Sequence, residues 1–178
     1  MAKSITLKKN TLLHIKKNLE KNAAEITANV IKNMEYIGER SVAIAREKGS
    51  YNDITGNLRS SIGYVVLSNG IPVAGGGFKQ TQGRGANMSL VQYKTKSGKE
   101  VKYWAKGASG DGSVGVSTGK ELLKKLQAKY SSGIVLIVCA GMEYAAYVED
   151  IHHKDVLVSA ELESEKLAKE LLKHLTDD

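Results

Sequence analysis

The stretch ASGDGSVGVSTGKELL, residues 108–123, contains glycines that lead into Gly119-Lys120, as a phosphate-binding loop does. Such a loop places four residues between its glycine and Gly-Lys, and a Ser or Thr that follows reaches magnesium. Here only three residues separate Gly115 from Gly119, and Glu121 stands in place of the hydroxyl, where its carboxylate would repel phosphate. The spacing argues against a nucleotide site and favours a linker that ends in a helix cap.

The same stretch matches the Gly-x-Ser-x-Gly pattern of a serine nucleophile, with Ser117 at its centre. That chemistry needs a buried strand before the serine, which holds it in a strained turn, whereas turn-forming residues precede Ser117. His152 and His153 are adjacent, so they would diverge rather than bind one ion. Cys139 lies in the apolar run IVLIVCA and is interpreted as a small buried hydrophobe. The sequence therefore predicts no enzyme, no cofactor and no metal site.

Basic and aromatic residues are interleaved in a second stretch, VQYKTKSGKEVKYWAK, residues 91–106. A β-ribbon of this composition can follow a phosphate backbone and stack on bases. The alternative is an exposed arm whose lysines keep it soluble and discourage edge-to-edge pairing. The residues expected to contact a partner protein or nucleic acid are Lys94, Lys96, Lys99, Lys102, Tyr103, Trp104 and Lys106.

Charge is unevenly distributed along the chain. The 178 residues, 42% of them hydrophobic, are enough for one domain with a substantial core. The net charge of +7 divides into +5 over residues 1–50, +8 over 51–130 and −6 over 131–178. Such a protein could bind nucleic acid through its basic middle, or its copies could pack basic surface against acidic surface.

The lack of a long apolar run and the cysteine content indicate in which cellular compartment the protein folds. No apolar run approaches the roughly 20 residues that span a bilayer, so no contact with a membrane is expected. The single cysteine excludes a disulfide framework. We therefore expect a protein that folds inside the cell.

Hydrophobic periodicity predicts the main elements. Apolar residues recur every three or four positions over 11–48, which predicts one long helix whose apolar stripe packs on a sheet of the same chain. Alternation over 62–67, the Asn69-Gly70 turn and residues 71–74 predict a hairpin, and Pro72 places its second strand at an edge or near the strand's start. A helix with a Thr118–Glu121 capping box, a central strand over 134–140 and a last helix over about 159–175 follow.

Residues 75–117 form an insertion rich in Gly, Ser, Lys and Gln and poor in apolar residues. This composition predicts an extended, arm-like hairpin that turns at Ser97-Gly98. The chain is thus predicted to be a single α+β domain with a core over 11–74 and 118–176. In it, a small, mostly antiparallel sheet packs against a long N-terminal helix and a C-terminal helix.

Two segments and their order resemble a known family. DITGNLRSSIGYVV, residues 53–66, follows the long helix, and AGMEYAAYVEDI, residues 140–151, precedes the last one. The pattern T-G-x-L-R-x-S-I before a strand, with Y-A-x-Y-V-E near the C-terminus, is similar to the head–tail joining and tail-completion (neck) proteins of long-tailed bacteriophages and prophages. In that family the second motif often continues with Gly-Thr and a Pro-Phe element, where this chain has Asp150-Ile-His-His-Lys-Asp.

The resemblance implies a structural virion protein that assembles in the bacterial cytoplasm. It implies a ring of identical subunits, six by family analogy, between head-connector and tail-tube proteins. The insertion would then contact a neighbouring subunit, the tail tube or DNA in the ring lumen. Arg59 could pair with Glu149 or Asp150 within or between subunits, and Tyr144 and Tyr147 are expected to pack against the long helix. The alternative function is that of a small basic nucleic-acid-binding protein that uses the hairpin 91–106.

Overall fold

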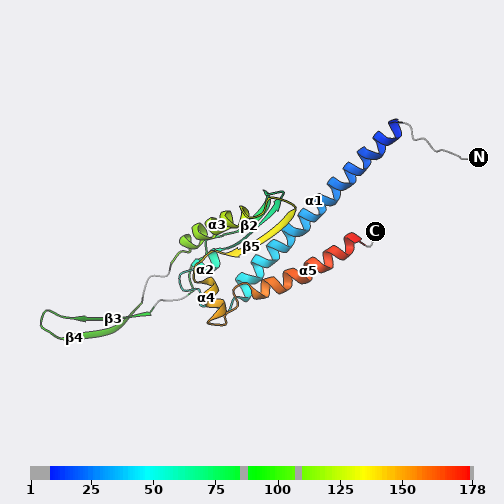
Figure 1. The fold of residues 1–178 in the computed structure, drawn as a ribbon. Helices are drawn as coiled ribbons and strands as arrows, with labels where there is room; N and C mark the ends of the chain where they lie inside the picture. The colour runs from blue at the N-terminus through cyan, green and yellow to red at the C-terminus, as the bar shows by residue number, and fades with distance from the viewer. Residues whose placement is uncertain (1–8, 85–87, 107–109, 177–178) are drawn as a thin grey trace, which may run out of the picture.

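The computed structural model describes residues 9–84, 88–106 and 110–176 (Figure 1). In chain order its elements are α1 (Lys9–Lys48), α2 (Asn57–Ser60), β1 (Ile62–Ser68), β2 (Ile71–Gly77), β3 (Met88–Lys94), β4 (Glu100–Lys106), α3 (Ser113–Gln127), β5 (Ile134–Ala140), α4 (Ala145–Asp150) and α5 (Val158–Thr176). Strands β1, β2 and β5 form one sheet, and β3 and β4 form a separate two-stranded ribbon.

The three-stranded sheet, in the order β2-β1-β5, is antiparallel throughout. Side chains alternate along a strand, so β1 directs Tyr64 and Val66 into the core that α1 covers and Val65 and Leu67 into the core that α3 covers. Both faces of the sheet are therefore packed against helices, and β1 is buried along almost its whole length. This arrangement confirms the predicted α+β fold.

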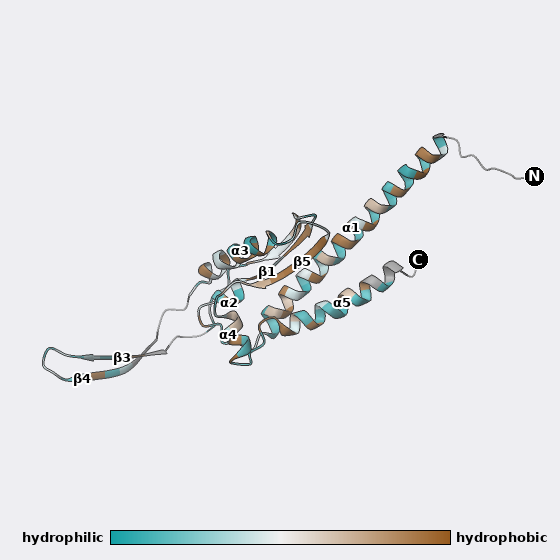
Figure 2. Cartoon of the chain, in the orientation of Figure 1, coloured by the Kyte–Doolittle hydropathy of each residue, from teal (hydrophilic) through white to brown (hydrophobic). Residues whose placement is uncertain are grey.

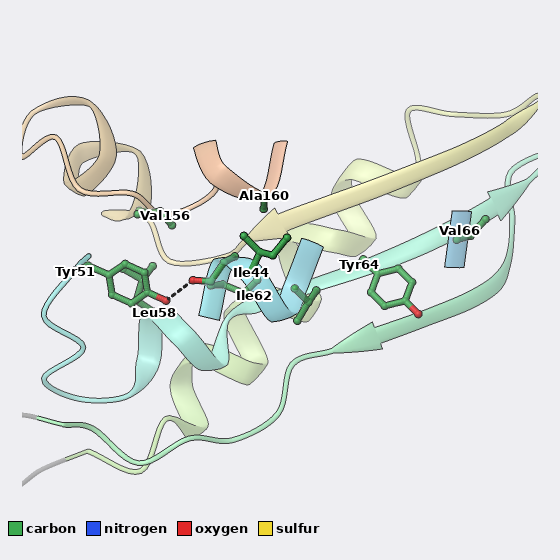
Figure 3. Close-up of a cluster of buried hydrophobic side chains, with 11 residues drawn as sticks. Ile44, Tyr51, Leu58, Ile62, Tyr64, Val66, Val156 and Ala160 are labelled. Carbon is green, nitrogen blue, oxygen red and sulfur yellow. Dashed lines mark hydrogen bonds between the residues drawn. The ribbon is translucent and has the colours of Figure 1, made fainter. Parts of the chain in front are cut away.

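Glycines allow α1 to pass close to the sheet. The ring of Tyr64 lies between Gly38 of α1 and Gly76 of β2, and a Cβ at either glycine would collide with it. The Tyr64 hydroxyl donates a 3.0 Å hydrogen bond to Oε1 of Glu39. Figure 3 shows how the surrounding core combines side chains from α1, α2, β1, α5 and the loops between them.

Helix α5 runs back along the inner half of α1 in the opposite direction (Figure 1). Ser41, a polar residue on the apolar side of α1, is only 2% exposed. Its Oγ lies 2.6 Å from Oγ of Ser164 on α5, a hydrogen bond that joins the two helices. Packing between α1 and α5 therefore explains a residue that interrupts the hydrophobic pattern.

Both predicted hairpins are present. Asn69 and Gly70 adopt φ angles of 50° and 79°, the positive values that an Asn-Gly hairpin turn requires. Strand β2 lies at a sheet edge, where Pro72 removes no ladder hydrogen bond that another strand needs. In the second hairpin Gly98 has a φ of 81°, at the predicted Ser97-Gly98 turn.

The position of β5 differs from the prediction of a central strand. It forms the other edge of the sheet, with β1 as its only partner among the described strands. Its sequence is apolar at every position because one face contacts the α1 core and the other contacts the α3 core. Burial on both faces produces such a run at an edge as well as at the centre of a sheet.

The predicted start of the helix after the insertion is also wrong. Helix α3 begins at Ser113, and Thr118 lies inside it, with Oγ1 donating to the carbonyl of Val114. At the true start, Oδ1 of Asp111 accepts a 3.0 Å hydrogen bond from the N–H of Ser113. The free part of the insertion is thus shorter than 75–117, because 75–77 belong to β2 and 113–117 to α3.

The outer half of α1 extends beyond the rest of the molecule (Figure 2). All residues over 10–29 are exposed, including Leu12, Leu19 and Ile26, whose exposed fractions are 52%, 64% and 56%. Only the inner half of α1 therefore packs on the sheet as expected. None of the helices in the described ranges is long and apolar enough to cross a membrane.

Candidate interaction surfaces

The segment TGNLRSS, residues 55–61, connects the body to both ends of the β3–β4 ribbon. Oγ of Ser60 accepts a 2.8 Å hydrogen bond from the N–H of Thr81, which precedes the ribbon. Oδ1 of Asn57 accepts a 3.2 Å hydrogen bond from the N–H of Gly115, which follows it. The motif that suggested a family resemblance thus holds both chain segments that lead to the ribbon.

Glycines make these segments pack backbone against backbone. The N–H of Gly83 donates a 3.0 Å hydrogen bond to the carbonyl of Gly110, which joins the two segments directly. Gly56 has a φ of 77°, and a Cβ there would collide with the carbonyl oxygen of Thr81. Gly112 also has a φ of 77°, and a Cβ there would collide with the carbonyl oxygen of Thr81 and with Oγ of Ser60. The ribbon is therefore mounted on a tightly packed base.

Arg59 pairs with Asp53 inside this base, so the predicted pairing with Glu149 or Asp150 within the subunit is wrong. Nη1 of Arg59 lies 3.8 Å from Oδ2 of Asp53, and the two side chains are 6% and 1% exposed. Burial raises the pKa of the Asp53 carboxyl, and the charges of Arg59 and Arg84 oppose that shift. The carbonyl of Asp53 also accepts a 2.8 Å hydrogen bond from the N–H of Arg84. Arg59 is consequently a structural residue of the base.

Glu149 caps α5 instead of contacting Arg59. Its Oε1 accepts hydrogen bonds of 3.3, 2.9 and 2.9 Å from the N–H groups of Val156, Leu157 and Val158. The first N–H groups of a helix have no partner within the helix, so this carboxylate satisfies donors at its start. Asp150, by contrast, is exposed. Of the three residues predicted at a subunit interface, only Asp150 lies on the open surface.

The glycines of the 108–123 stretch serve helix packing. A Cβ at Gly115 would collide with the carbonyl oxygen of Asn57, and one at Gly119 would lie 2.6 Å from that of Ser61. Gly141, after β5, faces the backbone of Gly119 equally closely. These contacts let α3 approach α2 and the end of β5. Ser117 lies on the exposed side of the helix, where its Oγ donates to the carbonyl of Val114.

The side chains of Cys139 and His152, two candidates for chemistry, are engaged in packing contacts. Cys139 is 4% exposed, and burial raises the pKa of its thiol to about 11. The ring of His152 contacts that of Tyr147 edge to face, with centroids 5.0 Å apart. Within residues 9–84, 88–106 and 110–176 no group of three His, Cys, Asp or Glu side chains is arranged to hold a metal ion.

An exposed apolar patch is formed by α4 and the two residues that flank it. Tyr144, Tyr147 and Ile151 are 40%, 54% and 59% exposed. The expectation that both tyrosines are buried against the long helix is therefore wrong. The residues of this helix that pack into the core are Ala145 and Val148.

The β3–β4 ribbon, residues 88–106, is called the arm from here on. Its register pairs Val91 with Tyr103 and Tyr93 with Val101, so these four side chains share one face. Lys94 and Lys102 lie on the opposite face, where they pair with Glu100 and Gln92. Tyr93 and Tyr103 are 51% and 49% exposed. The arm therefore has an apolar face and an opposite face of mixed character, where Lys94 and Lys102 lie beside Gln92, Glu100 and the 45% exposed Leu90.

The two tip lysines differ from the strand lysines. The N–H of Thr95 donates a 2.9 Å hydrogen bond to the carbonyl of Lys99, which extends the register by one pair. Alternation then places Lys99 at the end of the apolar face. Lys96 lies beside it in the turn, and both are exposed. Trp104 and Lys106 belong to β4, opposite Leu90 and Met88, but their side chains lie outside the described part of the structure.

A groove of about 360 Å³ runs between β5 and α5. Its floor is apolar, formed by Leu136 and Val138 of β5 and by Leu157 and Ala160. Two exposed carboxylates, Glu161 and Glu165, line it on the α5 side. Ser41 and Ser164, which join α1 to α5, also line the groove. This β5–α5 groove lies along the sheet edge that has no strand partner in the described ranges.

Sequence reasoning missed Asn57, Ser60 and Ser61, which hold the arm's base and the end of β5. The polar residues of TGNLRSS were the available signal, since three polar side chains just before a buried strand need partners. Comparison with known proteins adds no assignment, because no family model, curated protein or solved structure matches this chain.

Proposed function

We propose that the protein is a structural subunit of the neck of a long-tailed bacteriophage or prophage. It would assemble in the bacterial cytoplasm into a ring of identical subunits, six by family analogy, and would remain in the virion between head-connector and tail-tube proteins. The observation that carries this proposal is the arm, a ribbon with an uncovered apolar face whose two ends lead into a tightly packed base. A single isolated hairpin is marginally stable in water, so a partner is expected to cover it.

Two other observations support an assembly role. The T-G-x-L-R-x-S-I motif, which resembles that of neck proteins, builds the base of the arm. The molecule also exposes apolar side chains at separate places, on the outer half of α1 and on α4. Exposed apolar patches mark sites of protein association, and a neck subunit needs contacts with its neighbours, the head and the tail.

Deletion of the gene from an inducible prophage tests this function. We expect induced cells to release filled heads and separate tails, seen by negative-stain electron microscopy, and a plasmid copy of the gene to restore complete particles. The control is deletion of the gene for a tail fibre, which leaves head–tail joining intact. Complete virions from the deletion strain would overturn the proposal.

The alternative is a nucleic-acid-binding protein, and the face that carries Lys94 and Lys102 favours it. Binding through lysines would weaken steeply with salt, because each phosphate contact releases counterions. Fluorescence anisotropy with labelled duplex and single-stranded DNA at several salt concentrations measures this dependence. Tight, salt-sensitive binding by a monomer would favour the alternative over the neck protein.

A further inference from the structure

We propose that the arm of one copy docks into the β5–α5 groove of a second copy, with its apolar face on the groove floor and its tip lysines against Glu161 and Glu165. This inference rests on the proposed assembly of identical subunits. It does not depend on where in a virion the assembly lies.

The arm supplies an apolar surface that ends in positive charge. Val91, Tyr93, Val101 and Tyr103 share one face, and Lys99 continues that face at the tip. Over the whole arm, five lysines and one glutamate give a net charge of +4. Covering the two half-exposed tyrosines would remove a large apolar area from water, at roughly 25 cal/mol per Å².

The groove supplies the complementary features. Its floor is formed by apolar side chains of β5, of α5 and of the residue before α5, and the carboxylates of Glu161 and Glu165 stand beside it. Oε2 of Glu165 also lies 3.5 Å from Nζ of the exposed Lys169 in the next turn of the helix. At about 360 Å³ it falls in the range of cavities that bind side chains or small ligands. Residues 131–178, which contain β5 and α5, carry a net charge of −6. Both shape and charge therefore favour a basic, apolar occupant.

The dimensions of the two elements also match. Strands β3, β4 and β5 each contain seven residues, so the arm can lie along the full length of β5. The outer edge of β5 has no strand partner in the described ranges. An apolar edge strand of this kind tends to acquire one from another chain.

A second copy fits better than the arm's own chain. Figure 1 draws the arm projecting past α4, in the direction opposite to that in which α5 runs. The groove of the same chain therefore lies away from the arm. Contacts of this kind, in which different surfaces of identical subunits meet, are heterologous and close into rings when the rotation between subunits allows it.

Charge reversal on each side tests the docking in the full-length protein. Sedimentation velocity over a range of concentrations measures self-association of the wild type and of the variants K96E/K99E and E161K/E165K. We expect each variant to weaken association about tenfold or more, because like charges then face each other across the contact. Combining all four substitutions should restore the wild-type affinity to within about threefold, since opposite charges meet again.

A matched variant separates docking from a general effect of charge. K94E/K102E changes the net charge of the arm by the same amount but on the opposite face, so it should weaken association less than about threefold. On the groove side, E47K/E121K reverses the same two charges at exposed residues away from the groove and from the outer half of α1, and it should have equally little effect. Circular dichroism melts verify that all variants are folded.

Three outcomes would overturn the inference. The first is a wild-type protein that stays monomeric at all concentrations. The second is an equal loss of self-association in K96E/K99E and K94E/K102E. The third is a variant with all four substitutions, K96E/K99E/E161K/E165K, that does not regain the wild-type affinity. These outcomes differ from failure of the proposed function. If the protein forms a defined ring whose stability does not change with the charge substitutions, only the proposed docking of the arm is wrong. If virions are complete without the gene, only the proposed neck function is wrong, and the result of the charge substitutions still applies.

Discussion

At the residue scale, a substitution at Glu149 distinguishes a role of this residue in folding from a role at a subunit interface. Replacing Glu149 with alanine should lower the free energy of unfolding by about 1–2 kcal/mol, the usual cost of losing a helix cap, because the N–H groups of the first residue of α5 and of the two residues before it lose their acceptor. Urea denaturation followed by circular dichroism measures this change. Asp150→Ala is the matched control, since Asp150 is exposed and its loss should cost less than about 0.5 kcal/mol. Equal effects of the two substitutions would contradict the capping role.

Arg59 is the residue whose role differs most from the expectation. Arg59→Met should destabilise the protein by about 3–5 kcal/mol, since it removes the opposite charge beside the buried Asp53 carboxylate and leaves that carboxylate only backbone N–H donors. The double variant Asp53→Asn/Arg59→Met should be less destabilised than the sum of the single ones. Denaturant titration of the four proteins gives the interaction energy. Arg84→Met, at an exposed side chain near Asp53, serves as a control with a small expected loss. An additive double variant would show that the pair is not coupled.

Sequence reasoning succeeded where the information is local. Asn69-Gly70 and Pro72 constrain their own backbone, so a hairpin and an edge strand followed directly from residue type. Arg59 and Glu149 have partners chosen by tertiary packing, and only the folded chain shows that one meets Asp53 and the other the start of α5. Charge type limits the possible partners, but spacing does not select among them.

At the element scale, α3 shows how a glycine-rich stretch can resemble a reactive loop. Gly119→Ala should destabilise the protein by about 1–3 kcal/mol, as overpacking does, because its Cβ would press on Phe78 and the carbonyl of Ser61. In an isolated helix the same change would be stabilising by about 1 kcal/mol, so the sign separates packing from propensity. Ser117→Ala, two residues earlier on the exposed side, should change stability by less than about 0.5 kcal/mol. Thermal melts of both variants measure these changes. A Gly119→Ala protein more stable than the wild type would show that Gly119 is not required for close packing.

Element order was more predictable than element position. The long helix, both hairpins and the last helix followed from periodicity and turn residues. The edge position of β5 could not be predicted, because its apolar sequence reports burial on two faces and carries no information about how many neighbours pair with it. The start of α3 could not be predicted for a different reason, since its first turn consists of residue types that are also common in loops.

At the scale of the whole molecule, the body is expected to fold without the outer half of α1. A helix of 40 residues is about 60 Å long, and in this one the core contacts begin only at Ile31 and Met34. The exposed apolar side chains before that point belong to neither core cluster of the described residues. The periodic apolar stripe that these side chains form is left uncovered by the rest of the described residues.

Removing residues 1–27 should consequently leave the melting temperature within about 3 °C of the wild type, the shift that about 1 kcal/mol produces in a domain of this size. Removing residues 1–45 should unfold the protein, since Ile37, Val42 and Ile44 are lost from the core. Differential scanning calorimetry and one-dimensional NMR distinguish the two results. If the shorter deletion also unfolds the body, the outer helix contributes to folding through contacts that the subunit's core does not contain. If it stays folded but no longer restores particles to the prophage deletion strain, the exposed stripe of α1 is an assembly surface in its own right.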